Sequence, residues 1–419
     1  MPDAELRDLG KLAGEVADET VISMVQGMHD GISGRVFKAI GPGAEPVRVV
    51  HDRISAAGYG ALRRAAAGLG PLSAGLSRFV GGEEEVRSVS ASRVGRATQG
   101  AINGLIGDRL EREGSELRIE MAVRKPGRDI AVEEVGDEFE GATGRIAVFL
   151  HGLCETEEGW WLGTRADPAT DAPAPATYGQ RLREELGFTP VYVRYNTGLH
   201  VPENGRKLSS LLEQVRREWP VPVEEIALVG HSMGGLVARS ACHEAADAER
   251  AWLGDVRHLV CLAAPNNGSW LEKFVNVGGA ALKRLPETRP FADFLELRSA
   301  GIRDLRYGYV SELEWEAFDP DEVLRNRAQP LAPVPGVSYH FASAALANPG
   351  LAWLIGDLLV GPASARGPLG PDGAPSGDDH HFPGLVHFHL LNHPLVYERI
   401  HEWLEPAPAE AGAPVSLCA

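Results

Sequence analysis

Apolar runs alternate with amphipathic stretches through most of the chain, from about residue 113 to residue 405. The apolar runs predict buried strands at Arg145–Leu150, Pro190–Tyr195, Ile226–Val229, Val256–Ala263 and Tyr339–Ala344. Apolar positions at steps of three and four predict intervening helices, including Thr177–Leu186, Gly205–Glu218 and a closing helix at Val396–Leu404. Strands and helices that alternate with single connections predict an α/β fold, with a mostly parallel sheet covered by helices on both faces.

Three segments depart from this alternation. Residues 1–112 carry apolar side chains at helical spacing, such as Val21, Val25 and Met28, and are expected to form an N-terminal helical region. Residues 268–336 lose the regularity but are rich in aromatic side chains, so they are a candidate lid-like insertion in the domain 113–405. Residues 406–419 are expected to be a disordered tail.

The composition narrows the class of protein. The 419 residues include 44% hydrophobic residues, which is ample for a core. A formal net charge of −17 argues against binding to nucleic acid. The start of the chain lacks a secretory signal, and no run of about 18 apolar residues predicts a transmembrane segment. The four cysteines have the spacing of neither a zinc site nor a disulfide framework, so we expect a reduced, cytoplasmic protein.

The motif Gly230-His-Ser-Met-Gly234 lies between the Ile226–Val229 strand and an apolar run of small residues that predicts a helix. A sharp turn from strand to helix exposes a serine hydroxyl above the sheet, and the two glycines avoid clashes in that turn. The serine also lies at a helix N-terminus, where backbone N–H groups stabilise negative charge. Ser232 is therefore the predicted nucleophile.

A serine nucleophile needs a base and a carboxylate that orients the base, and in this architecture the chain order is serine, acid, histidine. His393 precedes the closing helix and is the expected base, with His389 as the alternative among several nearby histidines that include His387. Asp357 follows the Tyr339–Ala344 strand and is the expected acid. Asp304, in the irregular insertion, is its rival.

Two backbone N–H groups are expected to form the oxyanion hole. One belongs to Met233, which follows the nucleophile, and the other to Leu153, in the loop after the Arg145–Leu150 strand. His151, His231 and Cys154 flank these donors and are candidate substrate-binding residues. The position of His151 also suits a structural partner of the oxyanion loop.

These motifs together resemble those of α/β-hydrolase lipases and esterases, and most closely the bacterial lipase-like and GPI-inositol-deacylase-like (lipase class 2) groups. The similar segments are Phe149-Leu-His-Gly-Leu153, Arg194-Tyr-Asn-Thr-Gly198, Val229-Gly-His-Ser-Met-Gly-Gly235, Ala264-Pro-Asn-Asn-Gly-Ser269, Gly356-Asp-Leu-Leu-Val360 and Asn392-His393. The resemblance implies the α/β-hydrolase fold and carboxylic-ester hydrolysis through an acyl-enzyme. It implies a triad of Ser232, His393 and Asp357.

We therefore expect a serine esterase or lipase that acts on small-molecule or lipid esters with apolar acyl groups and uses no cofactor. The acidic stretch Asp378-Asp-His-His381 carries too few oxygen ligands to predict a calcium site, so no metal is expected. One alternative is a lipid-surface or partner-binding protein. In that case the N-terminal helices would bind the partner or make peripheral contact with lipid, and the hydrolase fold would be a scaffold without catalysis. Another is an acyltransferase that uses the same serine. The oligomeric state is left open.

Overall fold

The computed structural model describes residues 90, 93–162, 164, 176–268, 299–305, 308–311, 333–345, 357, 360–367 and 377–406. The expected helices before residue 90, the aromatic part of the 268–336 insertion and the tail beyond residue 406 lie outside these residues. Among the described helices, none is both long and apolar enough to cross a membrane.

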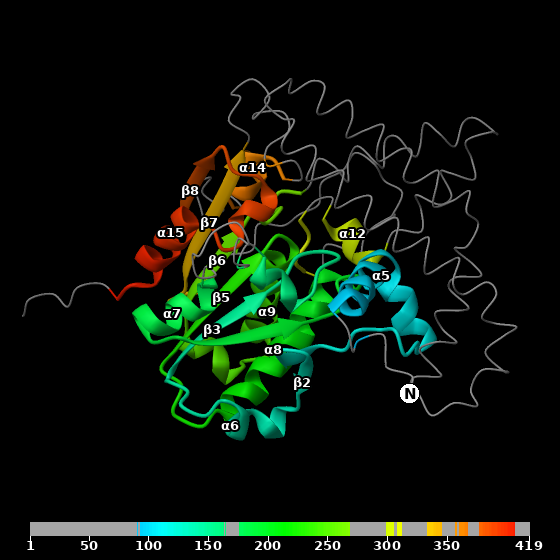
Figure 1. The fold of residues 1–419 in the computed structure, drawn as a ribbon, viewed down its shortest axis with the longest axis horizontal. Coiled ribbons are helices and arrows are strands. Elements are labelled where there is room, and N and C mark those ends of the chain that lie inside the picture. Colours follow the sequence, from blue (N-terminus) through cyan, green and yellow to red (C-terminus); the bar gives the residue numbers. More distant parts are fainter. Residues whose placement is uncertain are drawn as a thin grey trace, which may run out of the picture. The chain divides into compact units, whose positions relative to one another are not determined.

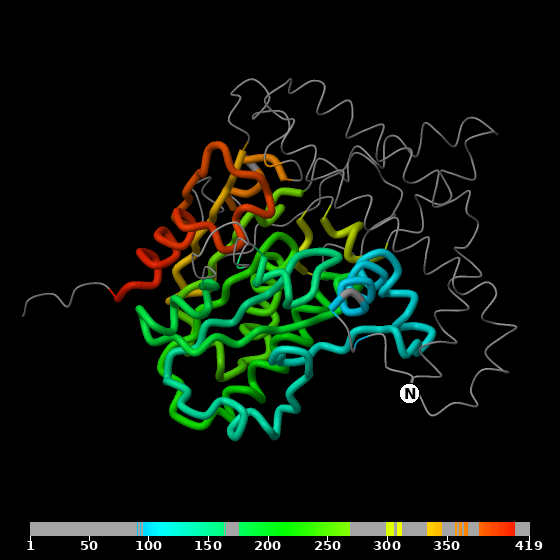
Figure 2. The backbone as a smooth tube through the Cα atoms, viewed as in Figure 1, coloured from blue at the N-terminus to red at the C-terminus, as the bar shows by residue number. Residues whose placement is uncertain are grey.

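The described residues form an eight-stranded sheet in the order β2-β1-β4-β3-β5-β6-β7-β8. The strands are β1 Ala122–Lys125, β2 Arg128–Ile130, β3 Arg145–Leu150, β4 Thr189–Arg194, β5 Glu225–His231, β6 Val256–Leu262, β7 Ser338–Ala345 and β8 Asp378–Pro383. All neighbouring strands from β4 to β8 pair in parallel, whereas β1 is antiparallel to both β2 and β4. The C-terminal segment, orange to red in Figure 2, brings β8 beside β7 at one edge of the sheet.

Helices connect the parallel strands and cover both faces of the sheet (Figure 1). The α-helices are α5 Arg93–Glu113, α6 Val135–Glu138, α7 Tyr178–Leu186, α8 Val201–Glu218, α9 Met233–Asp247, α12 Ala300–Asp304, α14 Pro362–Ala365 and α15 Pro394–Leu404. Short 3-10 helices are η3 Val132–Glu134, η4 Glu157–Trp161, η5 Ala251–Asp255 and η7 His387–Leu390. This is the α/β architecture that the alternating pattern predicts.

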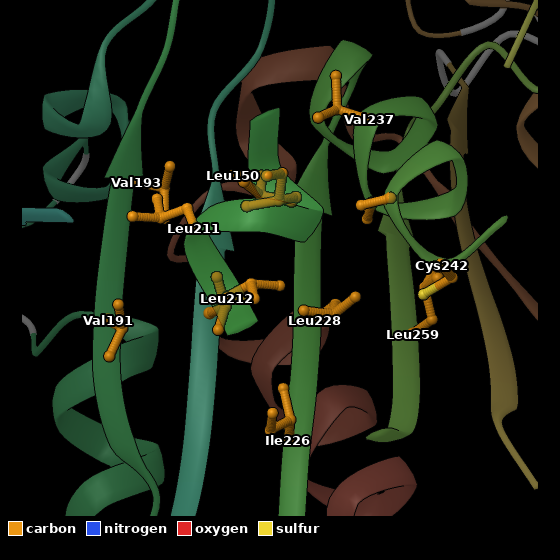
Figure 3. Packing of buried hydrophobic residues seen from close by; sticks show 14 of the residues in the cluster. Leu150, Val191, Val193, Leu211, Leu212, Ile226, Leu228, Val237, Cys242 and Leu259 are labelled. Carbon is orange, nitrogen blue, oxygen red and sulfur yellow. The ribbon is translucent and has the colours of Figure 1, made fainter. Parts of the chain in front are cut away.

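Alternate residues of each strand enter two separate hydrophobic clusters, as the two-residue period of a strand requires. On one face, Leu150, Ile226 and Leu228 pack with residues of α8 and α9 (Figure 3). On the other face, Phe149 and Val229 belong to the cluster that contains residues of α7 and α15. Strands buried on both faces explain why the sequence shows continuous apolar runs rather than alternation.

Local signals in the sequence set the ends of the helices. Thr177 and Gln180 form a reciprocal capping box at the start of α7, with side-chain to backbone distances of 3.1 and 2.8 Å. Gly187 ends the same helix with a φ of 72°, a conformation that glycine adopts without strain. The helix therefore begins and ends close to the predicted Thr177–Leu186.

The chain divides into two compact units, and the division passes through α5. Residues 93–99 and 109–118 belong to the first unit, in which Gln99 Nε2 donates to the carbonyl of Leu117 at 3.2 Å. Residues 100–108 belong to the second unit, together with the sheet. The predicted boundary at residues 112/113 stays a prediction, but one stretch of the N-terminal region groups with the unit that contains the sheet.

Candidate active site

The nucleophile turn follows β5 directly and leads into α9. Ser232 has φ 53° and ψ −122°, a strained conformation for a residue with a side chain. A Cβ added to Gly230 would lie 2.4 Å from the backbone of Gly234 and Gly235, and one added to Gly234 would lie 2.4 Å from the Leu150 carbonyl oxygen. Both glycines are therefore required by close backbone approaches, as the motif predicts.

The loop after β3 lies beside this turn because the strand order reverses there. The chain runs from β3 to β4 on one side and then to β5 on the other, so the carboxyl ends of β3 and β5 are neighbours. Such a switch point is the usual place for a site in an open parallel sheet. A Cβ added to Gly152 would lie 3.2 Å from Ser232 Cβ, which places the His151–Cys154 loop against the nucleophile.

The two predicted oxyanion donors follow the two residues in this contact, Met233 after Ser232 and Leu153 after Gly152. Met233 is the first residue of α9, so its N–H group has no partner within the helix. Leu153 follows Gly152 in the adjoining loop, and the Gly152 N–H group is already occupied by Glu155 Oε2 at 2.8 Å. The assignment of the Met233 and Leu153 N–H groups as oxyanion donors stays a prediction.

A buried histidine–carboxylate pair lies close to the nucleophile turn. His387 Nδ1 is 2.8 Å from Asp357 Oδ2, and Asp357 has no exposed surface. The backbone strengthens the pair, because the His387 N–H group donates to the Asp357 carbonyl at 3.0 Å. A proton on Nδ1 donated to the carboxylate leaves Nε2 as the free basic nitrogen.

His231 connects this pair to the nucleophile. Its Nε2 atom is 3.3 Å from the His387 carbonyl oxygen, and the two rings lie 4.8 Å apart. Since Ser232 is the next residue, His387 lies near the nucleophile. Among the described residues no hydrogen bond joins Ser232 Oγ to His387. In free enzymes this contact is often long and shortens when substrate binds.

The electrostatic surroundings of His387 favour its charged form. Burial by itself lowers the pKa of an imidazole, but the charge and the hydrogen bond of Asp357, with a smaller contribution from Glu155, raise the pKa of His387 above its usual value. A base with a raised pKa accepts a proton from a nucleophile more readily.

His393, the expected base, is not the histidine that contacts Asp357. It is the N-cap residue of α15, and its N–H group donates to the Tyr178 hydroxyl at 2.8 Å. Its Nδ1 atom is buried and forms no hydrogen bond with the described residues. The histidine that contacts Asp357 lies six residues earlier, in η7.

The two alternatives left open by the sequence have other partners. Asp304 is fully buried and accepts from the Val201 N–H group at 2.6 Å, where it caps α8, and it also lies 3.2 Å from His200 Nδ1. His389 Nδ1 accepts from the Val386 N–H group at 3.3 Å, and its side chain is exposed. Asp357 is therefore the predicted acid that contacts a histidine beside the nucleophile.

His151 is structural. Its Nδ1 atom is 3.0 Å from the Gly152 carbonyl oxygen, and its Nε2 atom accepts from the Tyr195 N–H group at 3.2 Å. The ring is fully buried and stacks on Tyr195. Burial lowers the pKa of His151, so the neutral ring fixes the shape of the loop.

The side chain of Cys154 packs against helix α5. A Cβ added to Gly104 of α5 would lie 2.3 Å from Cys154 Sγ, so the thiol faces this helix. Burial, with a smaller effect of Glu155, raises the pKa of the Cys154 thiol to about 12. The thiol therefore stays protonated, and it is a poor nucleophile.

Two residues of this site carry no signal that singled them out in the sequence. His387 is one of several histidines before the closing helix, and no local pattern distinguishes it from the others. Glu155 carries no such signal either, because a lone glutamate after a loop motif is usually a surface residue. A contact with Asp357 or His231 is visible only in three dimensions.

The acidic stretch at β8 makes protein contacts. Asp378 Oδ2 accepts from Trp403 Nε1 at 2.6 Å, and His381 Nδ1 is 2.9 Å from Ser343 Oγ. Within the described ranges, no group of three or more His, Cys, Asp or Glu side chains is arranged to hold a metal ion.

A sharp serine turn after a central parallel strand, next to an oxyanion-type loop, defines an α/β-hydrolase fold. Residues 171–282, which contain the Ser232 turn, match the family described as PGAP1-like alpha/beta domain. The sequence-based resemblance to the α/β hydrolases is thus confirmed. No curated protein matches the chain.

Solved structures similar to this one include bacterial esterases and lipases. The mature lipase BlEst2 of Bacillus licheniformis is 15% identical over 62% of this chain and 91% of its own, with a TM-score of 0.39. The lin2722 gene product of Listeria innocua is 15% identical over 64% and 96%, with a TM-score of 0.38. The carboxylesterase CesB of Bacillus subtilis is 12% identical over 63% and 85%, with a TM-score of 0.31.

Proposed function

We propose that this protein is a serine carboxylic-ester hydrolase with Ser232 as nucleophile, His387 as base and Asp357 as the orienting acid. The observation that carries the proposal is the 2.8 Å contact between His387 Nδ1 and Asp357 Oδ2 beside a strained serine turn. The serine, acid and histidine also follow one another in the chain order expected for this architecture.

The chemistry follows from the positions of these groups. Ser232 Oγ attacks the ester carbonyl carbon while its proton passes to His387 Nε2, and the carbonyl oxygen becomes an oxyanion that accepts from the Met233 and Leu153 N–H groups. The tetrahedral intermediate collapses, and the alcohol leaves with the proton from His387. Water then attacks the acyl-enzyme by the same route and releases the carboxylic acid and free Ser232.

Exposed apolar side chains support a substrate with an apolar acyl or alcohol group. Phe388, which follows the base, is 47% exposed, and its ring lies 5.5 Å from the His387 ring and 6.2 Å from the His231 ring. Leu162 is 46% exposed, and its carbonyl accepts from Asn392 Nδ2 at 2.9 Å. An apolar chain bound here buries surface at about 25 cal/mol per Å².

Hydrolysis of p-nitrophenyl acetate, butyrate, octanoate and laurate tests this proposal. We expect kcat/KM to rise from acetate toward the longer esters, and Phe388→Ala to reduce kcat/KM for the long esters while it leaves acetate hydrolysis unchanged. Good hydrolysis of acetate with none of the longer esters would exclude the apolar preference. No hydrolysis of any ester, together with no labelling of Ser232 by a fluorophosphonate, would exclude the enzyme itself.

A further inference from the structure

A second carboxylate, Glu155, lies beside the nucleophile, and the mechanism above does not use it. Its side chain is 16% exposed, and it follows the oxyanion loop directly. Glu155 Oε2 accepts from the Gly152 N–H group at 2.8 Å and lies 3.6 Å from His231 Nδ1. The Glu155 N–H group donates back to the Gly152 carbonyl at 3.3 Å, which closes a tight turn around the Leu153 donor.

His231 extends this contact to the base. Its Nδ1 side faces the Glu155 carboxylate, and its Nε2 atom lies 3.3 Å from the His387 carbonyl oxygen. Both ring nitrogens thus face oxygen acceptors, and the ring, which has no exposed surface, spans the space between oxyanion loop and base. The Trp160 ring also contacts the His231 ring in an edge-on arrangement, with 6.4 Å between ring centres.

The charged form of Glu155 is favoured by its neighbours. Burial by itself raises the pKa of the carboxyl group, but His231, the Gly152 N–H group and His151 together lower the pKa of Glu155 below its usual value. A partly buried carboxylate that stays charged is stabilised by fixed partners. It also acts at short range on nearby titratable groups, and it contributes to the raised pKa of His387.

We propose, on the basis of the function proposed above, that Glu155 is a positioning residue that holds the Leu153 donor and, through His231, the base His387 in the geometry of the transition state. The carboxylate fixes the oxyanion loop by its bond to the Gly152 N–H group, and it orients His231 by charge. Its negative charge also favours the protonated form of His387, which develops as Ser232 attacks.

Glu155→Gln tests the charge with the shape retained, because the amide oxygen still accepts from the Gly152 N–H group. We expect kcat to fall by up to about 10²-fold with little change in KM, since misplacement of a reacting group by about 1 Å has an effect of that size. The acid limb of kcat/KM should move to lower pH, because loss of a negative charge lowers the pKa of His387. Among the described residues, the titratable groups that interact with this histidine are Asp357, His231 and Glu155.

Glu184→Gln is the matched control, since Glu184 is an exposed glutamate of α7 and its replacement removes the same charge from the surface of that helix. Glu155→Asp keeps the charge on a shorter side chain, so it should lower kcat and leave the acid limb in place. A folded Glu155→Gln with the kcat and acid limb of the wild type would overturn the proposal. Should that variant fail to fold, a wild-type kcat in Glu155→Asp would overturn it.

Labelling of the wild type separates this proposal from the proposed function. If a fluorophosphonate labels Ser232 and the Glu155 variants behave as the wild type, only the role of Glu155 is wrong. If the wild type shows neither labelling nor ester hydrolysis, the proposed function itself fails.

Discussion

Gly104 of α5 lies against the His151–Cys154 loop, so a methyl group added at this position should displace the loop. In Gly104→Ala, the new Cβ would lie 2.3 Å from Cys154 Sγ and 2.9 Å from both the Cα and the N atom of Cys154. Ordinary contacts between such atoms are about 3.5–4.0 Å, so the loop must move by roughly 1 Å. Cys154 has little freedom to adjust, because its φ is 61° and its N–H group donates to Thr197 Oγ1.

Two opposed terms set the change in stability. Overpacking of a tight contact costs about 1–3 kcal/mol, whereas alanine in place of a helical glycine contributes about 0.5–1 kcal/mol. The net loss of unfolding free energy should therefore be about 1 kcal/mol, which leaves the protein folded. Activity should suffer more, because a shift of about 1 Å in a catalytic group lowers the rate by up to about 10²-fold.

The assay is kcat/KM for p-nitrophenyl butyrate together with thermal unfolding. Gly254→Ala is the control, since a Cβ at Gly254 meets no atom within 4 Å. In the double variant Gly104→Ala with Cys154→Ala, the closest contact is gone and the backbone contacts at 2.9 Å remain, so activity should recover in part. Wild-type kcat/KM in a folded Gly104→Ala would refute the reasoning that this helix supports the oxyanion loop.

Three further outcomes follow from the described contacts. Asp357→Asn should lower kcat by about 10⁴-fold without unfolding the protein, as measured by steady-state kinetics and circular dichroism, because an amide stabilises the wrong tautomer of His387. In the wild type, kcat/KM should fall with decreasing pH through a pKa above 6.5, since the base must be neutral and its pKa is raised; an acid limb below 6.5 would contradict this. Glu157→Ala should reduce the unfolding free energy measured in urea by about 1.5–3 kcal/mol, because buried Arg124 loses a charged partner at 2.7 Å while its ion pair with Asp129 remains; a loss below about 0.5 kcal/mol would contradict a stabilising contact.

The fold was predictable because each of its signals is local. The apolar runs marked β3, β5 and β6, and the glycines around Ser232 marked the turn, since each depends on residues close together in the chain. The order of the strands in the sheet depends on pairing between distant residues, for which the sequence carries no local signal.

The proposed base was not predictable in the same way. His387 and His393 both lie in the segment before α15, and only the buried pairing with Asp357, 30 residues earlier, distinguishes them. His393 occupies the more regular position next to Pro394, and that position turned out to serve as a helix cap. Glu155 was hidden for the same reason, since its partner His231 is distant in sequence.

The contacts of residues 100–108 could not be predicted from the sequence for a physical reason. Residues 100–108 continue a helix that begins in the first unit, yet Gly104 and Gly107 allow this stretch to pack tightly on Cys154 and Asn196 in the second. A run of small residues in a helix carries no direct sign of the surface against which it packs. A deletion of residues 1–110 would therefore remove the N-terminal region. It would also remove the helical stretch that packs against the loop containing Cys154.

The measurement that tests the central claim most directly is labelling by a fluorophosphonate, followed by intact mass and peptide mapping. The set comprises the wild type, Ser232→Ala, His387→Ala and His393→Ala. The account predicts one adduct on Ser232, none in Ser232→Ala, a labelling rate about 10²–10⁴-fold lower in His387→Ala, and a rate close to the wild type in His393→Ala. Slow labelling in His393→Ala with a normal rate in His387→Ala would contradict the assignment of the base.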